Sequence, residues 1–123
     1  MNNPTALLLE NEPVIAADLS TLLRDLGCQV LWAADGCEAL ALCALHVPDL
    51  VVLHFKQPDG TDGMSLARAL RANFPVKIFL VTGARQQDLE AAPDFEADCT
   101  TLFKPFTRWQ FKTMLQHIQQ RPP

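Results

Sequence analysis

The middle of the chain carries the segment Pro48-Asp49-Leu50-Val51-Val52-Leu53-His54. Its apolar run is short and is bounded by polar or proline residues, which predicts a buried strand. Similar runs recur on both sides of it and predict four more strands. The full set of expected strands is Thr5–Leu9, Gln29–Ala33, Leu50–Phe55, Val76–Val81 and Thr100–Phe103.

Helical periodicity fills the intervals between these runs. One apolar stripe consists of Ile15, Leu19, Leu22 and Leu26, and a second of Leu66, Ala67, Leu70 and Phe74. The segment from Asp35 to His46 is apolar nearly all round, with Asp35 as its natural start, and a short helix is expected around 85–92. Thr107-Arg108-Trp109-Gln110 has the pattern of a capping box. The last helix follows it, with one face formed by Phe111, Met114, Leu115 and Ile118, and should end before Arg121.

Strand and helix therefore alternate five times, which favours an α/β fold with a doubly wound parallel sheet covered by helices on both faces. With 123 residues, 49% of them hydrophobic, the chain 1–123 suits one domain. In such sheets, functional residues gather beyond the carboxyl ends of the strands. This rule selects Glu10, Asn11, His54, Thr82 and Lys104.

Composition narrows the function classes. The net charge of -4, without a cluster of Lys or Arg, argues against nucleic acid or an anionic membrane surface as the main partner. No apolar stretch approaches the roughly 20 residues that span a bilayer, and the polar start lacks the features of a signal peptide, so a cytoplasmic location is expected. The four cysteines form no Cys-x-x-Cys pair, which fits reduced thiols better than a metal site.

Several motifs in a fixed order carry a resemblance. They are Pro48–Leu53, the turn Pro58-Asp59-Gly60 followed by Asp62-Gly63-Met64, Thr82, and Lys104-Pro105-Phe106. Together they resemble the receiver domain of bacterial response regulators in two-component phosphorelay signalling, over essentially the whole chain. The resemblance implies a flavodoxin-like sheet of five strands in the order 2-1-3-4-5.

The resemblance also implies a set of site residues. In that family an aspartate at the end of the third strand accepts a phosphoryl group from a histidine kinase, near a Mg²⁺ ion held by acidic residues. Carried over, the acceptor position falls on His54, the acidic pair on Glu10 and Asn11, the hydroxyl on Thr82 and the phosphate-pairing lysine on Lys104. Thr101 occupies the position of the aromatic residue that many receivers use as a switch. Thr82 and Lys104 match the family, Glu10 matches in part, and Asn11 and His54 depart from it.

These departures predict altered chemistry. Mg²⁺ prefers oxygen ligands, and only Glu10 offers a carboxylate where the family pattern has three. We therefore expect weak or absent Mg²⁺ binding and no other cofactor. His54 has no carboxylate from which an aspartyl phosphate could form. Its imidazole either fills the vacated pocket or acts as a pH-sensitive or altered acceptor, with Glu10 or Asp59 pairing with His54 or Lys104.

Three neighbouring residues keep two interpretations each. Thr82 either holds an anion or bonds nearby backbone, and Lys104 is either a phosphate-binding remnant or part of a turn at Lys104-Pro105. Trp109 lies two positions before Phe111, about 200° round the helix, so it should point away from the core. It is then either an anchor for a partner or packed on its own helix terminus.

The sequence as a whole predicts a stand-alone, non-enzymatic receiver-like module that is independent of phosphorylation and acts by protein contact. The expected partner is a histidine kinase or a response regulator, or a second copy in a homodimer. Two alternatives stay open. One is a receiver phosphorylated at His54 or at a nearby side chain such as Asp59, and the other is a sensor of a small ligand or anion at the strand ends. Weak Mg²⁺ binding would distinguish the phosphorylation-independent module from the phosphorylated receiver.

Overall fold

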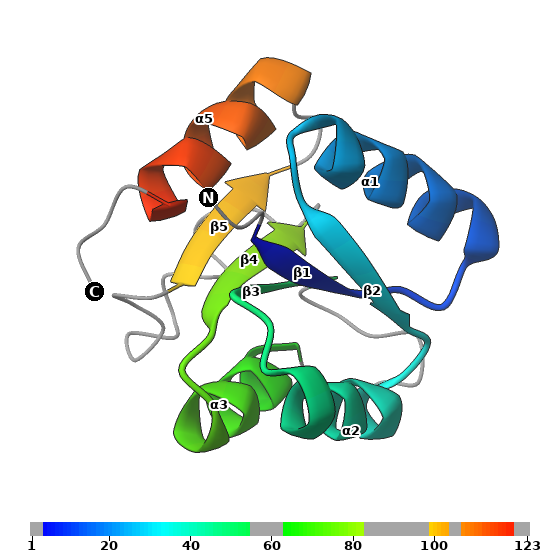
Figure 1. Cartoon of the computed structure of the whole chain (residues 1–123), viewed down its shortest axis with the longest axis vertical. Helices are drawn as coiled ribbons and strands as arrows, with labels where there is room; N and C mark the ends of the chain where they lie inside the picture. Colours follow the sequence, from blue (N-terminus) through cyan, green and yellow to red (C-terminus); the bar gives the residue numbers. More distant parts are fainter. Residues whose placement is uncertain (1–3, 55–62, 83–98, 104–106, 120–123) are drawn as a thin grey trace.

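The computed structural model describes residues 4–54, 63–82, 99–103 and 107–119 (Figure 1). Strands and helices alternate along most of the chain, as the sequence predicts. The strands are β1 (Thr5–Leu9), β2 (Gln29–Ala33), β3 (Leu50–His54), β4 (Lys77–Thr82) and β5 (Cys99–Phe103). The helices are α1 (Pro13–Asp25), α2 (Gly36–His46), α3 (Gly63–Asn73) and α5 (Arg108–Gln119). The helix predicted around residues 85–92 lies outside the described residues.

All strand pairs are parallel, and the sheet has the order β2-β1-β3-β4-β5. This arrangement confirms the predicted α/β class with a parallel sheet, and its order is the one that the resemblance implies. Strand β3, which forms the second part of the motif Pro48–His54, lies at the centre of the sheet, between β1 and β4. Because both of its neighbours are hydrogen-bonded to it, β3 has no exposed edge, which explains its unbroken apolar run.

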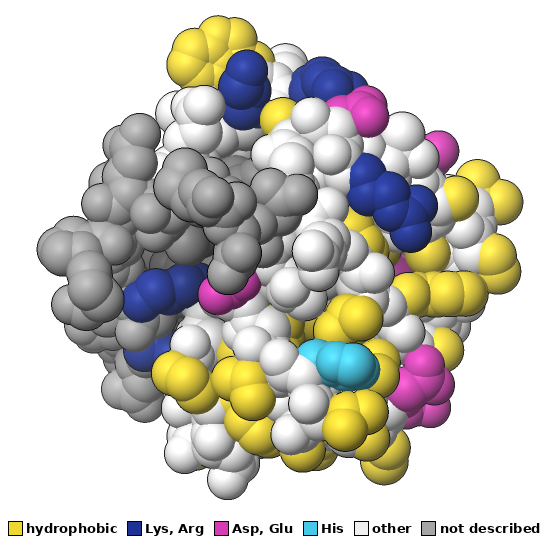
Figure 2. Space-filling view, viewed as in Figure 1, with side chains coloured by type: hydrophobic (Ala, Val, Ile, Leu, Met, Phe, Trp, Pro, Cys, Tyr) yellow, Lys and Arg dark blue, Asp and Glu magenta, His cyan; other side chains and the backbone are white. Residues whose placement is uncertain are grey.

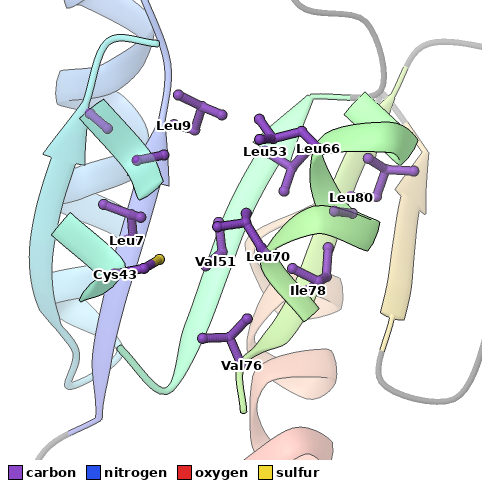
Figure 3. Close-up of a cluster of buried hydrophobic side chains, with 13 residues drawn as sticks. Leu7, Leu9, Cys43, Val51, Leu53, Leu66, Leu70, Val76, Ile78 and Leu80 are labelled. Carbon is purple, nitrogen blue, oxygen red and sulfur yellow. The ribbon is translucent and has the colours of Figure 1, made fainter. Parts of the chain in front are cut away.

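Side chains alternate between the two faces of the sheet, as the period of two requires. Leu7 and Leu9 of β1 point to the face covered by α2 and α3, where they join a core cluster with Val51 and Leu53 (Figure 3). Ala6 and Leu8 point to the opposite face, which α1 and α5 cover (Figure 1). The fold therefore has two hydrophobic cores, one on each side of a buried sheet.

The starts of two helices follow their predicted caps. The carboxylate of Asp35 accepts a hydrogen bond from the Glu38 backbone N–H at 2.8 Å, at the start of α2. At α5, the Thr107 hydroxyl accepts from the Gln110 N–H at 3.1 Å, and the Gln110 side-chain oxygen accepts from the Thr107 N–H at 2.8 Å. Both interactions satisfy backbone donors that a helix start leaves without partners. These two sequence predictions are confirmed.

The buried stripe of α1 is rotated slightly from its predicted position. Leu19 is buried as expected, but the centre of the stripe is formed by Ala16 and Leu23, whereas Ile15, Leu22 and Leu26 are only partly buried. Ala16, Leu19 and Leu23 are themselves three and four residues apart, so it is a neighbouring stripe of the same helix that faces β1 and β2. The stripe of α3 follows its prediction, with Leu66, Ala67 and Leu70 buried and Phe74 at its margin. Within the described ranges, no helix has the length and apolar character to cross a membrane.

Val47, which ends α2, adopts the left-handed backbone conformation with φ 43° and ψ 73°. A β-branched residue is strained there, and its side chain gains little burial because 49% of it is exposed. We therefore expect Val47→Asn to raise the free energy of unfolding by about 1 kcal/mol, measured by urea denaturation. Val14→Asn, at an exposed position in α1 with ordinary helical geometry, is the control. An equal gain in both variants would rule out relief of backbone strain as the cause.

Candidate functional site

The carboxyl ends of the central strands bring the predicted site positions to one edge of the sheet. In the register of β1 and β3, Leu8 is paired with Val52, so two residues further along both strands Glu10 and His54 are level with each other. His54 is paired with Val81, the residue before Thr82, in the register of β3 and β4. Three of the positions selected from the sequence therefore share this edge, as the rule for doubly wound sheets predicts.

Glu10 is the best defined of these residues and is only 5% exposed. Its backbone N–H donates to the Ala33 carbonyl at 2.9 Å, which extends the pairing of β1 with β2 by one residue. The carboxylate accepts a hydrogen bond from the Glu12 backbone N–H at 3.0 Å. Glu12 is the N-cap of α1 but makes no side-chain cap of its own, so the Glu10 carboxylate lies at the start of that helix. A carboxylate is favoured there by the exposed amides.

The remaining predicted positions are described to different extents. Asn11 follows Glu10 and is exposed. His54 and Thr82 are the last residues of β3 and β4, and Thr101 of β5 is paired with Leu80 of β4. The side chains of His54, Thr82 and Thr101 lie outside the described part of the structure. Lys104 and Asp59 lie wholly outside it, so the predicted pairing of these groups with Glu10 or His54 stays a prediction.

Trp32 is a neighbour of the site that the sequence analysis did not identify. It lies in β2, and its indole N–H donates a hydrogen bond to the Glu10 carbonyl at 2.6 Å. Its side chain is 46% exposed, so the indole reaches the Glu10 carbonyl while much of the ring stays in contact with solvent. An aromatic residue near the end of an edge strand is the only signal in the sequence, and it does not reveal which backbone group the indole would bind.

Trp109 points away from the core, as its spacing from Phe111 predicts. It is 69% exposed, whereas Phe111 is fully buried and its ring lies 5.2 Å from that of Phe79 in an edge-to-face arrangement. At the same end of α5, the Arg108 guanidinium forms an ion pair at 3.2 Å with Asp25, at the end of α1. The exposed indole thus lies next in sequence to a residue whose surface ion pair joins the start of α5 to the end of α1.

The cysteines whose side chains the structure describes are free thiols. Cys28 and Cys43 are buried and Cys37 is exposed. Burial, with a smaller effect of the Asp49 carboxylate, raises the pKa of the Cys28 thiol to about 11, and burial also raises the pKa of Cys43. Among the side chains that the structure describes, no three His, Cys, Asp or Glu residues are grouped to hold a metal ion.

Curated relatives of this chain are transcriptional regulatory proteins. Transcriptional regulatory protein PdtaR of Mycobacterium tuberculosis is 38% identical over 103 residues, which are 82% of this chain and 49% of that protein. A probable transcriptional regulator, ycf27 of Cyanophora paradoxa, is 30% identical over 98% of this chain and 50% of its own length. The chain thus spans about half the length of the curated relatives that it matches.

Solved structures and a family model lead to the same group of proteins. The receiver domain of the PhyR response regulator from Erythrobacter litoralis superposes with a TM-score of 0.83 at 24% identity, covering 100% of this chain and 97% of that one. A CheY-like receiver domain from Methylobacillus flagellatus gives a TM-score of 0.77 at 27% identity, covering 95% and 99%. The family model of the response regulator receiver domain matches residues 6–116. The chain therefore belongs to the response regulator receiver domain family.

Proposed function

We propose that this receiver domain takes part in two-component-type signalling by protein contact and does not form an aspartyl phosphate at the usual position. The observation that carries the proposal is the place of His54, the last residue of the central strand β3, level with Glu10 across the sheet. This is the position at which the family chemistry needs a carboxylate. An imidazole provides a different nucleophile with different charge and shape, so the family reaction has no acceptor there.

The metal that assists phosphoryl transfer in this family also lacks a suitable donor set here. Mg²⁺ demands several oxygen ligands, among them carboxylates. The Glu10 carboxylate already accepts a hydrogen bond from the Glu12 N–H, Asn11 offers only a neutral amide, and His54 offers nitrogen. We therefore expect these residues to bind the ion weakly or not at all, which supports a domain that works without it.

A protein partner is the natural target of such a domain. We propose a histidine kinase or a response regulator, or a second copy of this chain, with the surface around Trp109 as one point of contact. A large aromatic side chain that is mostly exposed in the first turn of a helix is a favourable anchor, because it brings much apolar area at little entropic cost.

The test is intact-mass analysis after incubation with acetyl phosphate and Mg²⁺. We expect the natural protein to keep its mass and His54→Asp to gain one phosphoryl group, because the substitution restores the missing carboxylate at the end of β3. Asn11→Asp combined with His54→Asp should gain it faster, since the double substitution provides all three carboxylates of the family pattern as Mg²⁺ ligands.

The matched control is His46→Asp, which makes the same chemical change at an exposed position at the end of α2. It should remain unmodified, because the side chains that the structure describes form no acidic group for Mg²⁺ around it. Phosphorylation of the natural protein would contradict the proposal, and peptide mapping would then locate the acceptor at His54, Asp59 or another side chain.

A further inference from the structure

The strand β2 forms one edge of the sheet. Within the described ranges it pairs with β1 alone, and Figure 1 shows it running between α1 and α2. An edge strand presents a row of main-chain donors and acceptors to which another strand can be added, and proteins commonly protect such an edge with Lys, Pro or a bulge. The segment Gln29–Ala33 contains no charged residue and no proline, and its register with β1 is regular. This edge therefore lacks the usual protection.

Two hydrogen bonds show which main-chain groups of β2 face β1. The Gln29 N–H donates to the Pro4 carbonyl at 2.8 Å, and the Ala33 carbonyl accepts from the Glu10 N–H at 2.9 Å. In a parallel pair, every second residue of a strand bonds to the neighbouring strand. The main-chain groups of Gln29, Leu31 and Ala33 are therefore directed toward β1, and those of the residues between them are directed outward.

The outward groups belong to Val30 and Trp32. Among the hydrogen bonds between residues that the structure describes, none uses the main-chain N–H or C=O of either residue. Both side chains lie on the α1 face of the sheet, where Val30 is only partly buried and Trp32 is 46% exposed. Apolar surface and main-chain groups without a strand partner thus coincide at the same two residues.

We propose that β2 pairs with β2 of a second copy of this chain, in an antiparallel and two-fold symmetric dimer whose two sheets become continuous. In the register centred on Leu31, that residue lies opposite Leu31 of the second copy, and Val30 lies opposite Trp32 of the second copy. The outward N–H and C=O groups of both strands then bond to one another. The inference rests on the proposed function, because it selects a second copy as the protein partner.

The strand complements itself, which favours a second copy as the occupant of this edge. A two-fold axis brings the same surface from each copy together, so the surface must suit its own side chains. Here the axis places a β-branched side chain, Val30, against an aromatic one, Trp32, on the same face of the sheet, and such cross-strand pairs are favourable. No like charges meet within Gln29–Ala33, because the segment has none.

The helices beside β2 have the right spacing for this dimer. Both α1 and α2 lie over β1 and β2. In a continuous sheet, α2 and its counterpart would therefore be separated by about two strand spacings, or roughly 10 Å, which is within the range of packed helices.

The surface of α2 suits such a contact. Its only ionisable side chains apart from cysteine are Glu38 and His46, and Leu45 is 74% exposed. Figure 2 shows hydrophobic side chains gathered over this helix. A helix that is apolar on nearly all sides is normally covered, and the second copy would cover part of it.

The first test is sedimentation velocity over a range of protein concentrations, in which we expect a concentration-dependent dimer. Trp32→Lys should raise the dimer Kd by about tenfold or more, because it removes two cross-strand aromatic contacts and places a lysine at the edge. Val30→Pro should also weaken the dimer, since it removes an outward N–H that β1 does not use. Gln116→Lys, which adds the same charge at an exposed position of α5, should change the Kd by no more than about twofold.

The second test locates the two-fold axis by a disulfide, in a Cys37→Ser background that lacks the exposed thiol. Leu31→Cys should give a covalent dimer after oxidation with diamide, because opposed residues in a pair without mutual hydrogen bonds have Cα atoms about 4.5 Å apart. Gln29→Cys is the control. Its two copies would lie roughly 13 Å apart along the strands, which is too far for a disulfide. Non-reducing electrophoresis measures the covalent dimer.

Several results would overturn the proposal. They are a monomer at all concentrations, equal cross-linking of Leu31→Cys and Gln29→Cys, and a dimer that survives both Trp32→Lys and Val30→Pro. Dissociation by Trp109→Lys but not by Trp32→Lys would place the interface on α5 instead.

The phosphorylation experiment separates this inference from the proposed function. If only His54→Asp is phosphorylated and the protein is a monomer, the domain works without aspartyl phosphate but its partner is another protein. If the dimer forms through β2 and the natural protein is phosphorylated, the interface stands and the proposed function is wrong.

Discussion

Phe111→Ala is expected to lower the free energy of unfolding by about 3 to 5 kcal/mol, which is a large part of the stability of a domain of this size. Phe111 is fully buried on α5, and its ring contacts Phe79 of β4 edge to face, with ring centroids 5.2 Å apart. Truncation removes the aromatic contact and leaves a cavity between α5 and the sheet. Urea denaturation followed by circular dichroism measures the change.

Trp109→Ala is the matched control, because it removes a larger aromatic side chain from the same helix. Its side chain is 69% exposed, so the expected loss is below about 0.5 kcal/mol. Phe111→Leu should fall between the two, since it keeps much of the apolar volume but not the edge-to-face contact. A loss at Phe111 as small as the loss at Trp109 would mean that α5 contributes little to stability through its buried face.

Local sequence signals predicted the elements of the fold well. The apolar run before His54 gave β3, and the caps at Asp35 and Thr107 gave the starts of α2 and α5. These signals succeed because the interaction that defines each element is made within a few residues of it. The buried stripe of α1 was predicted less well. Ala16, Leu19 and Leu23 also follow helical spacing, and the sequence does not show which of two adjacent stripes faces the sheet.

The candidate site also combines features that could be predicted from the sequence with features that could not. Its positions at the strand ends could be predicted, because parallel strands in register place Glu10 level with His54. The contact between Trp32 and the Glu10 carbonyl could not, since it joins residues 22 apart in the sequence. The strained backbone at Val47 carries no sequence signal at all, because the residue before a proline is expected to be extended.

Alkaline pH is expected to destabilise the protein through the buried Cys28 thiol. Burial, with a smaller contribution from Asp49, raises its pKa from an ordinary value of 9.0 to about 11. Below pH 9 the thiol is protonated in both the folded and the unfolded chain, so its full contribution to stability is present. Between pH 9 and 11 the unfolded chain ionises first, and about 2 to 3 kcal/mol is lost before the effect levels off.

The measurement compares the free energy of unfolding at pH 8 and pH 11 in the natural protein, Cys28→Ala and Cys37→Ala. Lysine titration contributes equally to all three, so it cancels in the comparison. Cys28→Ala should lose about 2 to 3 kcal/mol less than the natural protein over this interval, even if its stability at pH 8 is lower. Cys37 is exposed, so its removal should leave the alkaline loss unchanged. A full alkaline loss in Cys28→Ala would show that another group is responsible, and the buried Cys43 would be the next to replace.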